Sequence, residues 1–501
     1  PELCLTGYTC QDLFLQERLL EESLEGLQAV LEHTKGHDAL TFVGLPFEKD
    51  GKLYNVAAAV QDGRMLGLVP KQNIPNYGEF YEVRHFAAGS REVSEVDVLG
   101  QTVPFGGNLL FSCRNLKGLV VGCELCEDVW VMDPPSTALA KAGATVIVNL
   151  SASNETVGKD TYRKSLIAAT SARLLCGYVY ASAGDGESTQ DLVFSGHHMI
   201  AENGSVLAEA ARFENETIFS ELDIHKICHE RRRMSTFVPE NTETCVRIGF
   251  TLEKEETKLT RTFAQMPFVP SDETLKKERC EQILSIQAQG LKKRYEHTGA
   301  KTAVIGVSGG LDSTLALLVP ARAFDLLGKD RNDILAVTIP CFGTTNRTYE
   351  NACRLAQTLG AKLIEVNIRE AVQVHFRDIG QDMDKHDVTY ENGQARERTQ
   401  VLMDLANQSN GLVIGTRDMS ELALGWATYN GDHMSMYGVN VGVPKTLVRH
   451  LVAYCANTCS ESEKVLQEVL LDVLDTPVSP ELLPPEDGKI SQKTEDLVGP
   501  Y

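Results

Sequence analysis

Residues 307–314 carry the first group of side chains that can do chemistry: they read VSGGLDST and stand between two apolar runs. In a strand–loop–helix unit, such a loop points backbone N–H groups and a helix N-terminus at whatever is bound there. Gly309 and Gly310 allow the backbone to approach closely. Ser308 and Ser313 add hydroxyl donors. The loop therefore predicts an anion site, against the simpler alternative of a glycine turn that only caps a helix.

Asp312 lies inside this loop, where its carboxylate would repel a bare phosphate. The same carboxylate suits a Mg²⁺ ion that neutralises two adjacent phosphates. No lysine follows the loop as it does in the GxxxxGK[ST] pattern. We therefore expect a phosphate site that depends on magnesium rather than on a loop lysine.

Residues 119–128 form the second group, LVVGCELCED, in which a strand pattern runs into Cys126 and two acids. A thiol attacks only as the thiolate, so it needs a base and a nearby cation. Lys71, at the end of another apolar run, and Glu2, at the start of the chain, are the candidates. Cys123 and Cys126 also make a CxxC pair, but no second pair completes a zinc site.

Composition narrows the class of protein. A chain of 501 residues is too long for one compact core, which predicts two domains. Its net charge of −21 disfavours binding to nucleic acid or to an anionic membrane. Thirteen scattered cysteines suit reduced thiols in a cytoplasmic protein, and no apolar stretch reaches the roughly 20 residues that span a bilayer. Because the chain begins at Pro1 without a methionine, we expect flanking segments outside it.

Both halves alternate strand and helix patterns, which predicts layered α/β structure. In the first half, strands are expected at 39–45, 119–123, 144–150 and 177–181, with helices at 16–31 and 161–175. In the second half, a helix at 274–295 precedes strands near 302–307, 333–340, 362–368 and 411–416. Such spacing indicates a parallel, doubly wound sheet. We predict domains at 1–255 and 276–501, joined by a polar linker at 256–275.

The loop SGGxDS resembles the pyrophosphate loop of the ATP pyrophosphatases, which activate a carboxylate as an adenylate. Residues 415–426 (GTRDMSELALGW), 443–447 (VPKTL) and 394–398 (QARER) further resemble the NAD synthetase family over essentially all of 276–501. That resemblance implies ATP binding by Ser308, Gly309, Gly310, Asp312, Ser313, Arg398 and Thr416. It implies deamido-NAD binding by Glu421, Trp426 and Lys445, and Mg²⁺ held by Asp312 and Glu421.

Two departures from the synthetase pattern matter. Thr428-Tyr429 stands where ammonia-dependent members have Thr-Lys, whereas the larger glutamine-using members tolerate the tyrosine. The stretches 477–480 and 492–496 stand where the family has its substrate-covering loop, and we assign no single residue there.

The first half resembles the nitrilase superfamily of amidases, in the contexts PEL, PKQNIPNYGEFYE and CED. The resemblance implies an α-β-β-α sandwich in which Glu2 is the general base, Lys71 stabilises the oxyanion and Cys126 forms the acyl-enzyme. It also implies that Glu79 is a carboxylate near the lysine. The glutamine pocket is assigned to Tyr77, Trp130, Ser153 and Lys159.

Together the two resemblances imply a glutamine-dependent NAD synthetase, a ligase that uses ATP, Mg²⁺, glutamine and deamido-NAD. They also imply an enclosed ammonia passage and a homo-oligomer. Two alternatives remain open at this point. The second half could belong to another adenylate-forming amidotransferase, which would act on xanthylate or aspartate. The first half could be a catalytically silent docking module, in which Cys126 would not react with a glutamine analogue.

Overall fold

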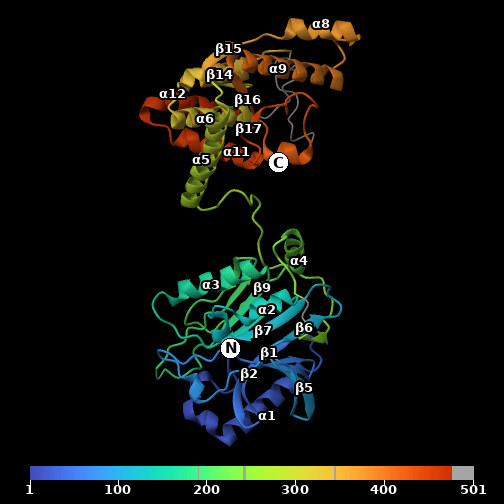
Figure 1. The fold of residues 1–501 in the computed structure, drawn as a ribbon, viewed down its shortest axis with the longest axis vertical. Coiled ribbons are helices and arrows are strands. Elements are labelled where there is room, and N and C mark those ends of the chain that lie inside the picture. The colour runs from blue at the N-terminus through green and yellow to red at the C-terminus, as the bar shows by residue number, and fades with distance from the viewer. Residues whose placement is uncertain (190, 241–243, 343–345, 477–501) are drawn as a thin grey trace. The chain divides into compact units, whose positions relative to one another are not determined.

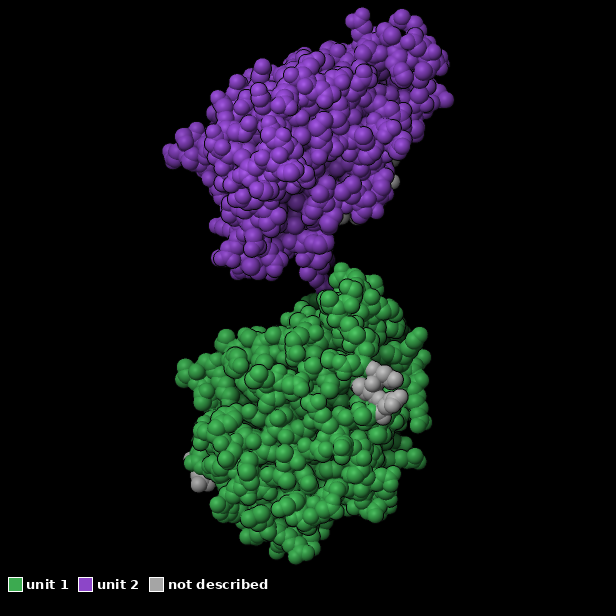
Figure 2. Space-filling view, in the orientation of Figure 1, with its two compact units in different colours: residues 1–262 green, residues 263–501 purple. Residues whose placement is uncertain are grey.

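The computed structural model describes residues 1–189, 191–240, 244–342 and 346–476. The chain separates into two compact units, Pro1–Thr262 and Phe263–Tyr501 (Figures 1 and 2). This division falls inside the segment 256–275 that the sequence predicts as a linker. The stretches 477–480 and 492–496 lie outside the described residues.

Two β-sheets packed face to face form unit 1 (Figure 1). The first sheet has the order β1 (Thr41–Lys49), β2 (Lys52–Gln61), β3 (Arg64–Pro70), β5 (Gln101–Phe105), β4 (Ser94–Val98). The second has the order β11 (Ser205–Glu209), β10 (Met199–Glu202), β9 (Gly177–Ser182), β8 (Val146–Ser151), β7 (Val120–Leu125), β6 (Leu109–Cys113), β12 (Val246–Phe250). Val69 of β3 packs with Phe111 of β6 and Val121 of β7 in the layer between the sheets.

Helices cover the outer faces of both sheets. These helices are α1 (Glu17–Thr34) on the first sheet and α2 (Pro135–Lys141) and α3 (Lys159–Leu174) on the second. Helix α4 (Ile224–Arg233) instead packs Ile224 and Ile227 against the layer between the sheets. Unit 1 also contains the short 3₁₀ helices η1 (Tyr8–Leu15), η2 (Glu82–Arg84) and η3 (Cys126–Val129). Leu27 of α1 shares a core with Leu45 of β1, and Ile167 of α3 shares a second core with Tyr178 of β9. Strands covered on both faces read as near-continuous apolar runs, such as VAAAV in β2. The predicted α-β-β-α sandwich is therefore confirmed.

A single five-stranded sheet forms the centre of unit 2. Its order is β15 (Lys362–Glu365), β14 (Ile334–Thr338), β13 (Thr302–Gly306), β16 (Gly411–Gly415), β17 (Tyr437–Gly438), and every neighbouring pair is parallel. After β13, the chain adds β14 and β15 on one side of this strand, and it later adds β16 and β17 on the other side. The carboxyl ends of β13 and β16 thus flank the topological switch point, where open α/β sheets bind ligands.

Helices pack on both faces of this sheet, as a doubly wound fold requires (Figure 1). They are α5 (Glu273–Thr298), α6 (Leu311–Leu327), α7 (Asn346–Thr358), α8 (Arg369–Ile379), α9 (Val388–Ser409), α10 (Met419–Leu424), α11 (Lys445–Asn457) and α12 (Lys464–Asp475), with η4 (Arg331–Asp333) and η5 (Glu461–Glu463). Leu284 of α5 and Leu451 of α11 belong to one core, and Phe376 of α8 to the other. Across the described residues, we find no helix with the length and apolarity needed to cross a membrane.

The first residues of the chain lie directly on β1, and Gly44 makes this contact possible. A Cβ atom at Gly44 would lie 2.5 Å from the Leu3 nitrogen and 2.7 Å from the Pro1 carbonyl oxygen. Both are backbone atoms, so a side chain here has no flexible neighbour to displace. Leu5 also donates its N–H to the Gly44 carbonyl at 3.1 Å. Gly44 therefore fixes the depth at which Glu2 enters the sandwich.

We expect Gly44→Ala to destabilise unit 1 by about 1–3 kcal/mol, because overpacking must push the N-terminal segment away from β1. Gly186→Ala is the matched control, since nothing lies within 4 Å of a Cβ placed there. The check is urea unfolding of both variants, followed by circular dichroism. Equal stability of the two variants would contradict the close contact.

Candidate functional site

Three buried ionisable side chains meet inside unit 1. The Lys71 ammonium donates to Glu2 Oε1 at 2.6 Å and to the two carboxylate oxygens of Glu82 at 2.9 and 2.7 Å. Lys71 and Glu2 are 0% exposed, and Glu82 is 5% exposed. A buried charge of this kind is tolerated only when it is paired and hydrogen-bonded.

Each member of this cluster comes from the end of a different element. Lys71 directly follows β3, Glu82 opens η2, and Glu2 stands on the segment that lies against Gly44. Glu2 is held further by the Asn55 amide at 2.6 Å and by the Ala152 N–H at 2.9 Å. The orientation of its carboxylate is therefore fixed by both sheets.

Burial sets the protonation states in the cluster. Burial alone would lower the pKa of Lys71, but the carboxylates of Glu2 and Glu82 raise it well above its ordinary value. Burial raises the pKa of Glu82 to about 8, although the Lys71 ammonium opposes this change. Near neutral pH the cluster thus contains the Lys71 ammonium beside a largely protonated Glu82.

Cys126 is the nucleophile candidate, and it stands at a sharp turn. It directly follows β7 and opens η3 with φ of 41°, in the left-handed region that L side chains rarely adopt. Burial raises the pKa of its thiol, Glu2 raises it further, and Lys71 lowers it. The thiol is therefore protonated at rest, so a nucleophilic role would require a base, and Glu2 lies within electrostatic reach of it.

The carboxylate beside the lysine is Glu82, so the expectation for Glu79 is wrong. Glu79 is exposed, and its carboxylate accepts instead from the Asn154 amide at 2.5 Å. The reason is local: residues 77–80 form a turn, closed by a bond from the Phe80 N–H to the Tyr77 carbonyl. The chain then enters η2, which turns Glu82 inward and leaves Glu79 at the rim.

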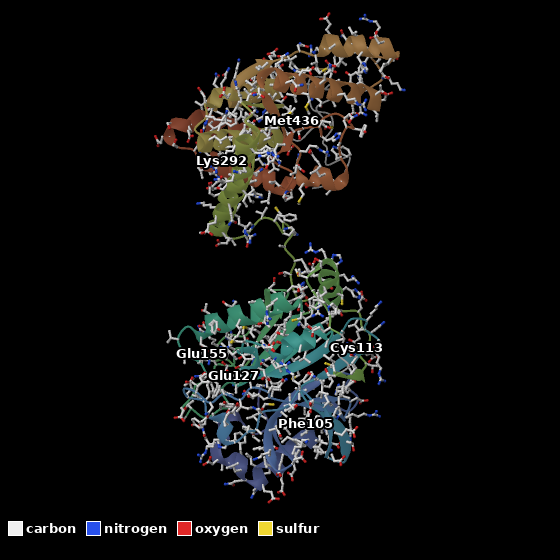
Figure 3. All side chains as sticks on the ribbon, viewed as in Figure 1. Phe105, Cys113, Glu127, Glu155, Lys292 and Met436 are labelled. Atoms are coloured by element: carbon white, nitrogen blue, oxygen red, sulfur yellow. The ribbon has the colours of Figure 1, made fainter. Side chains whose placement is uncertain are left out.

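Residues assigned to the substrate pocket gather around Cys126 to different degrees. The Lys159 ammonium lies 5.5 Å from the ring centres of both Trp130 and Phe80, which is a cation–π arrangement. The Tyr77 hydroxyl donates to Glu127 at 2.8 Å, and Figure 3 labels Glu127 in unit 1. The Cys126 sulfur contributes to the pKa of both Tyr77 and Lys159, which places them within electrostatic reach of the nucleophile.

Ser153, the remaining pocket candidate, is buried and held from behind by a fully buried arginine. Arg163 donates to the Ser153 hydroxyl at 3.3 Å and to the Asn154 carbonyl at 3.1 Å. The same guanidinium pairs with Glu155, which Figure 3 labels in unit 1. Arg163 therefore supports the backbone of this loop and is not available to a substrate.

The loop after β13 in unit 2 is closed by its own side chains. The Ser308 and Ser313 hydroxyls lie 3.1 Å apart, and the Gly310 N–H donates to Ser308 Oγ at 3.3 Å. Gly309 has φ of 84°, and a Cβ there would lie 2.0 Å from the Thr348 carbonyl oxygen. Only glycine fits this position, so the loop is preformed at the N-terminus of α6.

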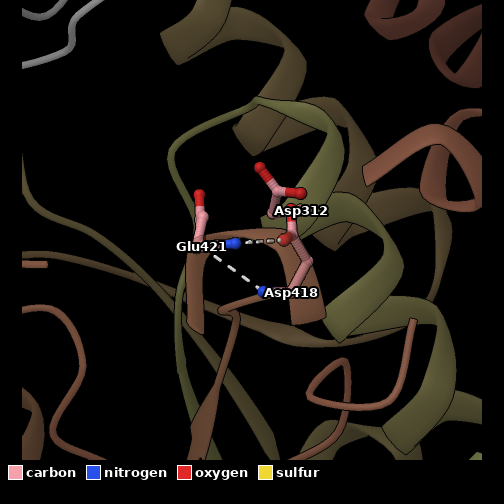
Figure 4. A group of neighbouring side chains, drawn as sticks. All are labelled: Asp312, Asp418 and Glu421. Carbon is pink, nitrogen blue, oxygen red and sulfur yellow. Dashed lines mark hydrogen bonds between the residues drawn. The ribbon is translucent and has the colours of Figure 1, made fainter. Parts of the chain in front are cut away.

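Asp312, Asp418 and Glu421 bring their carboxylates together at the carboxyl edge of the sheet (Figure 4). One oxygen from each lies within 4.8 Å of the others, and this is the one such group among the described residues. Asp418 caps α10 by accepting from the Glu421 N–H at 2.9 Å. Burial raises the pKa of Glu421 to about 7. Three converging carboxylates suit a hard divalent cation.

Lys445 occupies the same cluster from the start of α11. Its ammonium hydrogen-bonds to Asp312 and lies 3.3 Å from Asp418 Oδ2 and 3.5 Å from Glu421 Oε1. Burial would lower the pKa of Lys445, but the carboxylates of Asp312 and Glu421 raise it above its ordinary value. One ammonium among three acids leaves negative charge that a metal ion can neutralise.

The structure also places the other predicted residues of unit 2. Thr416 directly follows β16, and Arg398 lies mid-way along α9, where its charge acts on Cys341 just after β14. Both therefore stand near the carboxyl edge of the sheet. Trp426 follows α10, donates its N–H to the Glu421 carbonyl at 2.9 Å and is 50% exposed.

Sequence reasoning missed three residues that hold these sites. Glu82 lies in the motif EFYE, but Glu79 was assigned from the sequence as the carboxylate near the lysine. Asp418 lies in the motif GTRDMSE, but no role was assigned to it from the sequence. Asn440 is 0% exposed and donates to the Asp312 and Thr416 carbonyls, each at 3.0 Å. It joins the first turn of α6 to the residue that follows β16, and no sequence pattern marks it.

Comparisons with known proteins assign each unit to a family. Residues 1–231 match the carbon-nitrogen hydrolase family, and residues 283–469 match the NAD synthase family. The chain is 42% identical to the glutamine-dependent NAD(+) synthetase of Mycobacterium leprae, covering all of this chain and 76% of the relative. It is 29% identical to the synthetase of the same name from Aquifex aeolicus, covering 80% of that protein.

A solved structure adds a third comparison. The glutamine-dependent NAD+ synthetase of Acinetobacter baumannii, in complex with adenosine diphosphate, is 26% identical over 94% of this chain and 77% of that chain, with a TM-score of 0.37.

The protonation of Glu82 predicts a pH dependence of stability. Its pKa in the folded chain lies above its ordinary value, so folding binds a proton there. The stabilisation is complete below the pKa of the unfolded chain and is lost as pH rises toward about 8. We expect the free energy of unfolding to fall by roughly 1 kcal/mol per pH unit across that window.

Glu82→Gln mimics the protonated acid and should remove this contribution, whereas the exposed Glu79→Gln should keep the wild-type slope. Urea unfolding at about pH 6 and about pH 8 checks this difference. Identical slopes in Glu82→Gln and wild type would contradict the assignment.

Proposed function

Because the chain belongs to the family of glutamine-dependent NAD(+) synthetases, we propose that Cys126 in unit 1 hydrolyses glutamine and that unit 2 uses the ammonia to amidate deamido-NAD. The overall reaction converts deamido-NAD, ATP, glutamine and water into NAD, AMP, pyrophosphate and glutamate. The observation that carries the proposal for unit 1 is the buried Glu2–Lys71 pair, 2.6 Å apart, beside a strained and buried cysteine.

The glutaminase step starts with transfer of the thiol proton from Cys126 to Glu2. The thiolate attacks the side-chain carbonyl of glutamine, and the Lys71 ammonium stabilises the oxyanion that forms. The carbon–nitrogen bond then breaks, and Glu2 returns its proton to the leaving ammonia. A water molecule, deprotonated by Glu2, hydrolyses the thioester and releases glutamate.

The rim of the pocket supplies charge and shape for glutamine. Lys159 is partly buried between two aromatic rings, so its ammonium is well placed to bind the substrate carboxylate. The Tyr77 hydroxyl and the Ser153 region supply further polar contacts. Burial lowers the pKa of Lys159, but its neighbours Glu79 and Glu155 favour the charged form.

Unit 2 activates the nicotinate carboxylate at the loop after β13. The carboxylate attacks the α-phosphorus of ATP, and pyrophosphate leaves into the cradle formed by Ser308, Gly309, Gly310 and Ser313. Ammonia then attacks the adenylated carbonyl, and AMP leaves. Arg398 and Thr416 stand near this edge to bind ATP, and Trp426, half exposed beside α10, remains a predicted contact of deamido-NAD.

The carboxylate cluster fits Mg²⁺ by the chemistry of its donors, with Asp418 added to the predicted pair of Asp312 and Glu421. Bound there, the ion would neutralise the charge of the transferred phosphates. Lys445 contributes a second positive charge to the same cluster, and Asn440 keeps Asp312 beside Thr416. A homo-oligomeric assembly stays a prediction.

We expect wild-type chain to make NAD from deamido-NAD and ATP with either glutamine or ammonium as donor. Cys126→Ala should lose at least about 10³-fold of the glutamine-driven rate, as removal of a covalent nucleophile does, while ammonium-driven synthesis persists. Cys123→Ala, three residues earlier and buried, is the matched control. NAD formation is measured by chromatography. Equal loss with both donors would contradict the division of labour.

Asp418→Asn should raise the Mg²⁺ concentration that gives half-maximal ammonium-driven synthesis by about 10-fold or more, because one charged ligand is lost. Asp404→Asn, an exposed acid on α9, should leave it unchanged. A magnesium titration of both variants distinguishes them. An unchanged titration for Asp418→Asn would show that this carboxylate holds no metal.

A further inference from the structure

Asp128 is a buried carboxylate that the proposed mechanism does not use. It is 0% exposed, and it lies two residues after Cys126 in η3. An aspartate is rarely buried in this way without a partner of opposite charge. The question is what this carboxylate holds.

Its contacts join the two catalytic segments. On one side Asp128 Oδ2 accepts from the Leu125 N–H at 3.0 Å. On the other side Oδ1 accepts from the Asn73 N–H at 2.8 Å, from the Asn73 side-chain amide at 2.8 Å and from the Gln72 N–H at 3.2 Å. Leu125 immediately precedes the nucleophile, and Gln72 immediately follows Lys71.

We propose that Asp128 is a positioning residue, which sets the placement of Cys126 relative to Lys71 by tying the end of β7 to the turn after β3. The inference rests on the proposed function, because it takes Cys126 as the nucleophile and Lys71 as the oxyanion partner. Asp128 acts through the backbone and does not touch the reacting atoms.

The arrangement of the sheets makes such a tie necessary. β3 belongs to the first sheet and β7 to the second, so Lys71 and Cys126 are not linked by any shared strand pairing. Apolar packing between the sheets tolerates small shifts, whereas a carboxylate that accepts several N–H bonds has a fixed distance to each. The bond to Leu125 also closes the turn that holds Cys126 at its strained φ of 41°.

A carboxylate suits this position better than its amide. All of these partners are N–H donors, and an ionised aspartate accepts through both oxygens. In Asp128→Asn one oxygen becomes an NH₂ group, which would face an N–H donor and leave it unsatisfied in a buried place. The variant keeps the volume of the side chain, but it loses the hydrogen bonds either to Leu125 or to Gln72 and Asn73.

Displacement of a reacting group by about 1 Å can cost about 100-fold in rate. We expect Asp128→Asn to lower kcat for glutamine-driven NAD synthesis by roughly 10- to 100-fold, with the KM for glutamine changed by less than about 3-fold. Ammonium-driven synthesis, the activity of the other unit, should stay within about 2-fold of wild type, and the nearly unchanged KM for glutamine reports that unit 1 is folded.

Asp133→Asn is the matched control, because Asp133 lies five residues further on with its side chain 76% exposed, and it should behave as wild type. Asn73→Ala removes one donor from the other side of the tie and leaves the backbone bonds. We expect it to lower kcat by a smaller factor, and to add little in the double variant with Asp128→Asn.

The outcomes separate this inference from the proposed function. If wild type shows no glutamine-driven synthesis, the proposed function fails first. If wild type is active but Asp128→Asn keeps its kcat, or loses only affinity for glutamine, the positioning role is wrong. Where Asp128→Asn does not fold, Asn73→Ala decides: an unchanged kcat overturns the role.

Discussion

A buried ammonium between carboxylates is the constraint on which the structure of unit 1 depends. Lys71 is fully buried, and its charge is compatible with that position only because Glu2 lies 2.6 Å away and Glu82 lies 2.7 Å away. These partners come from the chain start and from η2, so both segments must reach the end of β3. Gly44 lets the first of these segments lie directly on β1.

Unit 2 also gathers charged side chains at one place, and there the carboxylates outnumber the ammonium. Parallel strands bring Asp312, Asp418 and Glu421 to one edge of the sheet, and a single ammonium from Lys445 only partly compensates them. The remaining negative charge is stable once a cation is bound and is costly otherwise. Asn440 joins the two segments that carry these acids by donating to the Asp312 and Thr416 carbonyls. In the proposed function, the two units use buried charge for different purposes, proton transfer in one and phosphate binding in the other.

The fold and the main chemistry could be predicted from the sequence because each is encoded locally. Apolar runs with helical stretches between them indicated layered α/β structure in both halves and the parallel sheet of unit 2, whereas the sandwich of unit 1 was expected from the resemblance to the nitrilase superfamily. The proposed pyrophosphate loop occupies consecutive residues from Ser308 to Ser313. Contacts that depend on the geometry of a turn or on distant residues could not be predicted from the sequence. Glu79 and Glu82 are only three residues apart, and only the turn into η2 decides which one meets Lys71. Asn440 links residues 24 and 128 positions away, which no local pattern reveals.

The central claim is that Cys126 carries the acyl group of glutamine as a thioester. Intact-protein and peptide mass spectrometry of the chain, mixed with glutamine and quenched in acid, tests this most directly. We expect a γ-glutamyl adduct on Cys126 and on none of the other cysteines among the thirteen, and no adduct in Glu2→Gln, where the thiol keeps its proton. Release of glutamate without any adduct in wild type, or an adduct on a different cysteine, would contradict the claim.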